Sequence, residues 1–103
     1  KQLDVRVLTL GDGEGATKLK LMQIPGVESR KPRNRFIHTT LGFSYITISV
    51  TDTNAAVKRL EKAGVKTLKK TPLALPAPLP TDVYLTLVRD PDGNFVELVG
   101  PKK

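Results

Sequence analysis

Cysteine and tryptophan are absent from this sequence, methionine occurs once, and aromatic residues make up 5% of its 103 residues. The lack of cysteine excludes disulfides, thiolate metal sites and a cysteine nucleophile, and it fits a reducing compartment. No apolar run reaches the roughly 18–20 residues of a membrane-spanning helix, and no secretory signal is visible. A chain of this length has room for one small domain, which we expect to be cytoplasmic and without a membrane partner.

Positive charge is in excess, with 17 Lys and Arg against 10 Asp and Glu and a net charge of +7. Most of it is interpreted as a solvated basic surface; the alternatives are an anionic small ligand or a nucleic acid. Proteins that bind single strands interleave basic and aromatic residues, whereas aromatics are few here and the basic residues are spread out. The one basic cluster, at residues 30–35, falls in a predicted connection. The pattern therefore argues against a nucleic-acid partner.

The N-terminal part is predicted to be a β-hairpin. Residues 3–10 are rich in Val, Leu and Thr, and residues 17–23 alternate between polar and apolar side chains, as strands do. Residues 11–15 between them contain three glycines, which accept the positive φ angles of a tight turn. Residues 27–41 are polar and basic and are interpreted as a linker.

A strand and a helix are predicted next. Residues 44–51 alternate strictly, and Asp52 or Thr53 can cap a helix by accepting from its free backbone N–H groups. The helix is expected to end at Ala63, because Gly64 suits the position after a helix. Its apolar stripe should pack on one side of the sheet. The side chains expected to meet are Ala56, Leu60 and Ala63 of the helix with Ile46, Ile48, Val50, Val96 and Leu98 of the strands.

Three more strands are predicted after the helix. Residues 65–70 are interpreted as a short strand, and residues 71–81 hold four prolines and are interpreted as a stiff loop rather than a strand. Strands are expected at residues 82–89 and 94–99, on either side of an Asp-Pro-Asp-Gly turn at 90–93. The order strand, helix, strand, strand, strand predicts an α+β fold.

The sequence also contains a weak internal repeat. The N-terminal hairpin has the same form as the last one, and Lys20-Leu21 lies where Glu97-Leu98 lies. The hairpin is therefore interpreted as the end of an earlier copy whose first strand, helix and second strand are absent. The predicted organisation is a hairpin from an incomplete first module at 1–26, a basic linker at 27–41 and a complete βαβββ module at 42–103.

Three segments in order resemble the vicinal oxygen chelate superfamily, which includes glyoxalase I, extradiol dioxygenases and bleomycin-resistance proteins. They are the strand and cap at residues 42–52, Arg-Leu-Glu-Lys-Ala-Gly-Val at 59–65, and Arg-Asp-Pro-Asp-Gly-Asn-Phe-Val-Glu-Leu at 89–98. The resemblance implies two βαβββ modules curled around a cleft. It also implies a divalent metal, held in each module by a His on the first strand and a Glu on the last, which acts as a Lewis acid toward substrate oxygens.

Most of the implied metal ligands are replaced in this sequence. By the resemblance, the second module's His position is Tyr45, its Glu position is Glu97 and the first module's Glu position is Lys20. A tyrosine is a poor ligand because its phenol stays protonated up to a pKa of roughly 10, and a lysine cation cannot bind another cation. A degenerate site follows, with no cofactor or, at most, Zn, Ni, Fe or Mn at Glu97.

Two of these side chains also have structural interpretations. Glu97 can serve as the partner of Lys20 across the cleft, since such ion pairs persist without any catalytic role. His38, the one histidine, lies outside the matched positions and is interpreted as linker surface or local packing. Phe36-Ile37 is interpreted as an apolar anchor of the linker.

Alternation along the strands predicts the rest of the cleft. It should be apolar with hydroxyl groups and excess positive charge, which favours an anionic or phenolic small molecule. Glu97 and Tyr45 are the candidate catalytic residues. The candidate ligand-binding residues are Lys18, Lys20, Met22, Thr47, Ser49, Tyr84 and Phe95, with Thr86 beside Tyr84.

Three functions are compatible with this sequence, and whether the protein is an enzyme stays open. The first is a metal-poor member of the superfamily that binds a small organic ligand. The second is a metal-dependent lyase or isomerase of the lactoylglutathione lyase type, or a dioxygenase, and the third is a non-catalytic interaction module.

A homodimer is also expected. Val5, Val7, Leu19 and Leu21 are taken as one apolar side of the hairpin, and an exposed side of that kind tends to find a partner. Free strand edges act in the same direction.

Overall fold

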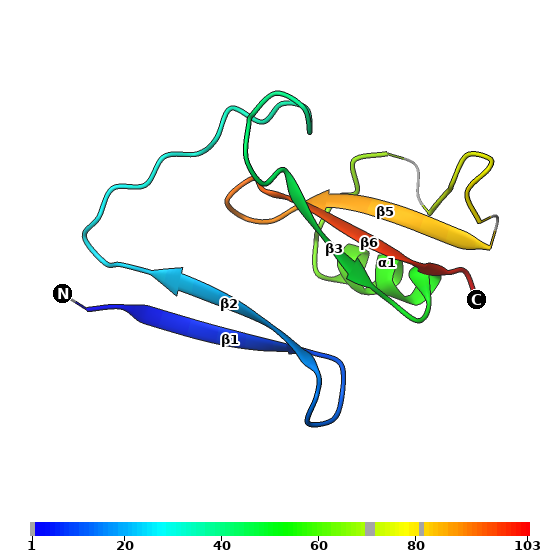
Figure 1. Ribbon diagram of the computed structural model, residues 1–103, viewed down its shortest axis with the longest axis horizontal. Helices are drawn as coiled ribbons and strands as arrows, with labels where there is room; N and C mark the ends of the chain where they lie inside the picture. The colour runs from blue at the N-terminus through cyan, green and yellow to red at the C-terminus, as the bar shows by residue number, and fades with distance from the viewer. Residues whose placement is uncertain (1, 70–71, 81) are drawn as a thin grey trace. The chain divides into compact units, whose positions relative to one another are not determined.

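The computed structural model describes residues 2–69, 72–80 and 82–103, and the chain divides into two compact units (Figure 1). The hairpin unit is Lys1–Arg30 and the module is Lys31–Lys103. The predicted α+β class is confirmed. Within the described residues, no helix is both long and apolar enough to span a membrane.

The hairpin unit consists of β1 (Asp4–Leu10) and β2 (Thr17–Gln23), paired antiparallel. Gly11 and Gly13 in the turn have φ angles of 99° and 92°, which only glycine adopts without strain. The predicted hairpin is confirmed to within one residue.

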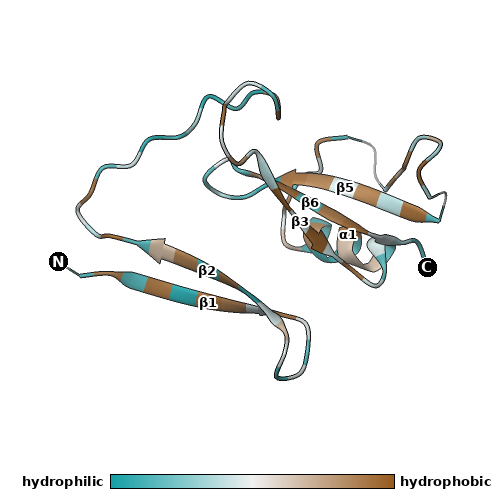
Figure 2. Ribbon diagram, in the orientation of Figure 1, coloured by the Kyte–Doolittle hydropathy of each residue, from teal (hydrophilic) through white to brown (hydrophobic). Residues whose placement is uncertain are grey.

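The faces of this hairpin differ from the prediction. The register pairs Val5 with Met22 and Val7 with Lys20, so these valines share a face with the lysines and not with Leu19 and Leu21. The expectation of one apolar side was wrong, because the register pairs odd-numbered residues of β1 with even-numbered residues of β2. Hydrophobic colour consequently lies along both strands (Figure 2), and exposed apolar side chains occur on both faces: Val5, Val7 and Met22 on one, Leu8 and Leu21 on the other.

The module is a four-stranded sheet of order β3-β6-β5-β4 with one helix. Its strands are β3 (Tyr45–Ser49), β4 (Leu73–Ala74), β5 (Val83–Arg89) and β6 (Phe95–Pro101). β3 runs parallel to β6, and the other pairs are antiparallel. Parallel neighbours cannot be joined by a tight turn, and the chain between β3 and β6 accordingly includes the helix. The predicted strand–helix–strand–strand–strand order is confirmed.

The helix α1 (Thr53–Lys62) begins at the cap Asp52, whose side chain accepts from the backbone N–H groups of Asn54 and Ala55 at 3.0 and 3.3 Å. Desolvation raises the pKa of Asp52, but backbone N–H donors and the charge of Lys103 lower it, and the net shift is downward. The Asp52 carboxylate therefore stays ionised at pH values below the ordinary aspartate pKa, and it continues to accept the backbone N–H groups of the helix there. Gly64 follows with φ 79°, as predicted.

The buried stripe of α1 is Thr53, Ala56 and Val57. Ala63 was expected in the stripe but is the exposed C-terminal cap. The helix packs on β5 and β6, and it lies on one face of the sheet (Figure 1). The helix does not extend over β3, and Ile46 on that strand is therefore 42% exposed, whereas the prediction had it packed against the helix.

The second strand of the module was misplaced. Residues 65–69 form no strand, although the Leu68 N–H donates to the Leu87 carbonyl at 2.9 Å; Lys70 lies outside the described residues. The pairing strand is β4, which lies inside the proline-rich segment and pairs Leu73 with Leu85. This strand is only two residues long and lies at the edge of the sheet. Prolines are tolerated next to edge strands, so the proline-rich segment can still contain it.

Gly100 is where β6 passes closest to the chain that leaves β3. A Cβ atom at Gly100 would collide with the Val50 carbonyl, and this approach is fixed by the hydrogen bond from Val50 N–H to the Val99 carbonyl at 2.8 Å. Only glycine fits, because the obstacle is backbone and not a flexible side chain.

Gly100→Ala is therefore expected to lower the free energy of unfolding by about 1–3 kcal/mol, the usual cost of forcing atoms into a packed site. Chemical denaturation followed by circular dichroism measures it. Gly15→Ala, where nothing lies within 4 Å, is the control and should leave the midpoint of unfolding unchanged. Equal stability of the two variants would contradict the close approach.

Candidate functional site

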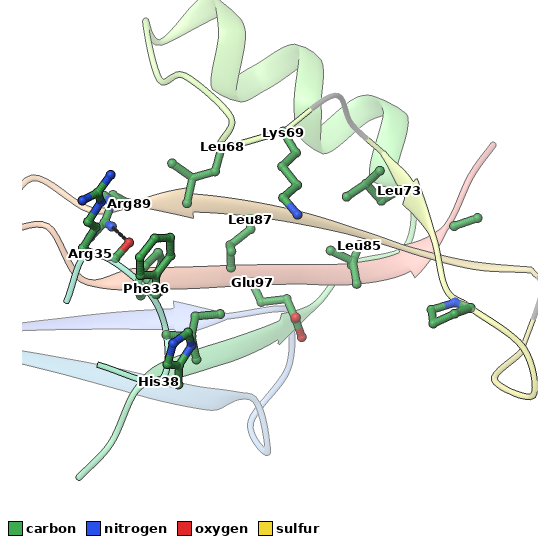
Figure 3. Close-up of a pocket in the computed structure, with 14 residues that line it drawn as sticks. Arg35, Phe36, His38, Leu68, Lys69, Leu73, Leu85, Leu87, Arg89 and Glu97 are labelled. Atoms are coloured by element: carbon green, nitrogen blue, oxygen red, sulfur yellow. Dashed lines mark hydrogen bonds between the residues drawn. The ribbon is translucent and has the colours of Figure 1, made fainter. Parts of the chain in front are cut away.

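A cavity of about 660 Å³ opens on the module (Figure 3). Its floor comes from β5 and β6, where the register places Leu87 opposite Glu97 and Leu85 opposite Val99. The intervening residues Thr86 and Val88 are buried, and α1 lies behind the sheet (Figure 3). Glu97 thus projects from the face away from the helix, as alternation predicted.

Two segments form the walls. On one side is part of the loop 33–40, and on the other are Leu68 and Lys69 together with Leu73, Ala74 and Pro76 (Figure 3). The volume falls in the range of small-molecule sites, roughly 300–1,000 Å³. The apolar lining is Phe36, Ile37, Leu68, Leu73, Ala74, Pro76, Leu85, Leu87 and Phe95; the charged or polar lining is Arg35, His38, Lys69, Arg89 and Glu97.

Glu97 is held by its neighbour on β3. The Thr47 hydroxyl donates to Glu97 Oε1 at 3.0 Å, and the two residues are directly paired in the parallel register. An ionised carboxylate accepts several hydrogen bonds, so Glu97 retains acceptor capacity toward a ligand hydroxyl or amine.

Arg89 connects the loop 33–40 to the sheet. Its Nη1 donates to Asn34 Oδ1 at 3.0 Å and to the Gly93 carbonyl at 2.8 Å. Its Nη2 donates to the carbonyls of Asn34 and Arg35 at 2.9 and 3.2 Å. Asn34 Nδ2 also donates to the Gly93 carbonyl at 3.0 Å. With both terminal nitrogens used, Arg89 serves the structure of the cavity rather than an anion in it.

The Asp-Pro-Asp-Gly-Asn turn presents the carbonyl that Arg89 uses. Asp90 Oδ1 accepts from the N–H groups of Asp92 and Asn94 at 3.0 and 2.8 Å, and Gly93 has φ 89°. The guanidinium of Arg89 also lies over the Phe95 ring, 4.0 Å from its centroid, and this cation–π contact covers the buried ring. The stretch at residues 89–98, which resembles the superfamily, therefore forms a turn and holds one wall of the cavity in place.

The loop 33–40 presents a flat surface to the cavity. Phe36 and His38 stack with centroids 5.6 Å apart and planes 7° from parallel, and the Arg35 guanidinium lies 5.3 Å from the Phe36 centroid. Phe36 is 51% exposed, so its ring is available for a further contact.

Of the predicted site residues, Glu97 and Phe95 line this cavity. Thr47 reaches it through Glu97. Tyr45 is paired with Phe95 and Ser49 with Val99, and both are exposed on β3 outside the lining.

Tyr84 and Thr86 do not face the cavity. They are paired with Gly100 and Leu98, on the side of the sheet away from Glu97, and the Lys102 ammonium lies 5.5 Å from the Tyr84 ring. Their predicted placement was wrong because the even-numbered residues of β5 fall on the helix side, which leaves Leu85, Leu87 and Arg89 to line the cavity.

Lys18, Lys20 and Met22 share one face of the hairpin unit, as alternation predicted. The pairing of Lys20 with Glu97 stays a prediction.

The wall residues were missed by sequence reasoning. His38 was interpreted as linker surface, but it lines the cavity beside Phe36. The available signal was the apolar pair Phe36-Ile37 in a polar segment, which marks a point of contact; nothing in that pattern shows what it contacts. Leu68 and Lys69 were assigned to a short strand at residues 65–70, and its alternation did not show which side chains face the cavity.

The implied metal can be tested against the donors. In the described ranges, His, Asp and Glu side chains nowhere gather in threes that could hold an ion, whereas metal sites of this kind use three or more such ligands. Glu97 offers a single carboxylate that already accepts from Thr47.

The sequence pattern of the Glyoxalase/Bleomycin resistance protein/Dioxygenase superfamily matches residues 4–98. This match spans nearly the whole chain and agrees with the βαβββ order and the cavity on the Glu97 face. The chain belongs to this superfamily.

Solved structures have the same fold at low sequence identity. A glyoxalase family protein from Bacillus cereus superposes with a TM-score of 0.68 at 18% identity, over 98% of this chain and 63% of its own. An integron cassette protein from Vibrio cholerae gives 0.55 at 20% identity, over 93% of this chain and 75% of its own. This chain thus spans less than two thirds of the Bacillus cereus protein.

Proposed function

We propose that this chain is a glyoxalase-like module that binds a small organic anion in the cavity over Glu97, without a resident metal. The supporting observation is the combination, in one cavity, of an apolar lining, a single carboxylate and several cationic side chains. Such sites use the apolar surface for affinity and a few polar groups for orientation.

The lining favours a flat molecule with a donor and an acid group. Leu85 and Leu87 on the floor and Phe36 on the wall favour an apolar ring. Glu97 would accept from a hydroxyl or amine on that ring. Arg35 and Lys69 are exposed at the cavity and would attract a carboxylate, since partly exposed cations still steer anions. A hydroxylated aromatic acid such as salicylate combines these features.

Salicylate should therefore bind the 103-residue chain in the low millimolar range or tighter, and Leu87→Asp should weaken binding about tenfold or more by placing a negative charge under the ligand. Ser49→Asp is the matched control, since it adds the same charge on the same face outside the lining. NMR titration measures both affinities, with the His38 ring as reporter of the cavity and the Met22 methyl as reporter of the hairpin.

Shifts confined to Met22, or equal weakening by the two aspartate variants, would contradict binding in the cavity. Phe36→Ala, which removes an exposed side chain, provides a second test if Leu87→Asp lowers the melting temperature.

The second candidate, a metal-dependent lyase or dioxygenase, is favoured by the retained Glu97 of the superfamily pattern. We expect no tight divalent-metal binding by this chain, because Tyr45 and Lys20 replace a His and a Glu that bind the metal in the superfamily pattern. Elemental analysis after dialysis against a weak chelator checks this. Stoichiometric zinc, nickel, iron or manganese that disappears in Glu97→Gln would establish the second candidate instead.

We also propose a homodimer. The hairpin unit exposes apolar side chains on both faces, including Val7 at 52% and Leu21 at 49%, and such surface favours association. Light scattering on the 103-residue chain should report twice the monomer mass at micromolar concentration, and Leu21→Lys with Val7→Lys should shift it toward monomer. A wild-type monomer at high micromolar concentration would contradict the dimer.

A further inference from the structure

The loop 33–40 is a preformed unit. The Thr39 hydroxyl donates to the carbonyls of Arg33 and Phe36 at 3.0 and 2.7 Å, and the Thr40 hydroxyl donates to the Arg33 carbonyl at 2.6 Å. The Thr39 N–H also donates to the Phe36 carbonyl at 3.1 Å. These bonds lie within the loop, so they hold its shape without attaching it to the sheet.

Attachment depends on one polar cluster. Among the described residues, four hydrogen bonds join this loop to the rest of the module, and they use Asn34 and Arg35 on the loop side and Arg89 and Gly93 on the other. Most of the loop is exposed, and only Asn34 and Ile37 are partly buried. An element with little buried apolar surface is held with low local stability.

We propose that Arg89 and Asn34 are positioning residues that hold the loop 33–40 closed as a wall of the cavity, and that a bound ligand and this closure stabilise each other. The inference rests on the proposed function, because Phe36 and His38 contribute to the site only while the loop is docked. A ligand that contacts the docked loop must favour docking by the same factor by which docking favours the ligand.

The arginine is specific for this role. Its planar guanidinium reaches four acceptors through two nitrogens while it stacks on Phe95. A lysine ammonium keeps the charge but is a point donor without the planar fork. Arg89→Lys should therefore release the loop and leave the strand pairing in place.

Limited trypsin digestion tests the closure, because the bonds after Arg33 and Arg35 lie in the loop. Arg89→Lys should speed cleavage at these two bonds about tenfold, and Asn34→Ala should have a smaller effect since its backbone carbonyl remains. Arg59→Lys, the same substitution on the exposed side of α1, is the matched control. Cleavage after Lys58 in α1, which belongs to the same module, reports general unfolding of the module and should not change.

Saturating salicylate should slow loop cleavage in the wild type, and Arg89→Lys should weaken salicylate binding with an unchanged melting temperature. Loop cleavage unchanged in both Arg89→Lys and Asn34→Ala would overturn the clamp, as would equal acceleration at every bond. The cleavage arm needs no ligand, so it separates failure of the clamp from failure of the proposed function. A released loop with unchanged salicylate affinity would overturn the coupling.

Discussion

The site depends most directly on the guanidinium of Arg89. It joins the turn that follows β5, the buried ring that begins β6 and the loop that precedes β3. Charge-assisted bonds to carbonyls are stronger than neutral ones, and here they substitute for the apolar burial that a 103-residue chain has in short supply. Because Arg89 is occupied in this way, the proposed function assigns the attraction of an anionic ligand to Arg35 and Lys69.

Sheet alternation separates the stability of the module from its chemistry. Thr86 and Val88 are buried on the helix side, whereas Leu85, Leu87 and Glu97 line the cavity on the other side. A shift of register by one residue would exchange these sets. Such a shift is opposed at Gly100, because any other residue at this position of β6 would collide with the Val50 carbonyl. A residue remote from the cavity thus helps to keep Glu97 on the cavity side.

Sequence reasoning reached the parts of the fold that local physics determines. The helix cap Asp52, the glycine turns and the alternation that turns Glu97 from the helix each follow from a few neighbouring residues. It failed where distant contacts decide: β4 at Leu73–Ala74 forms because β5 offers it an edge. His38 lines the cavity because Arg89, far along the chain, holds its loop. No local pattern carries that information.

The surroundings of Glu97 decide what its carboxylate can do in the proposed function. In a metal site a carboxylate gives its lone pairs to the cation, which then polarises the substrate. Here Glu97 accepts from the Thr47 hydroxyl, and its remaining lone pairs are open to further hydrogen-bond donors. In the proposed function, this acceptor beside apolar walls would bind a hydroxyl group of the ligand. Because the Glu97 carboxylate would repel an anion, the proposed function leaves the attraction of an anionic ligand to Arg35 and Lys69, which also line the cavity.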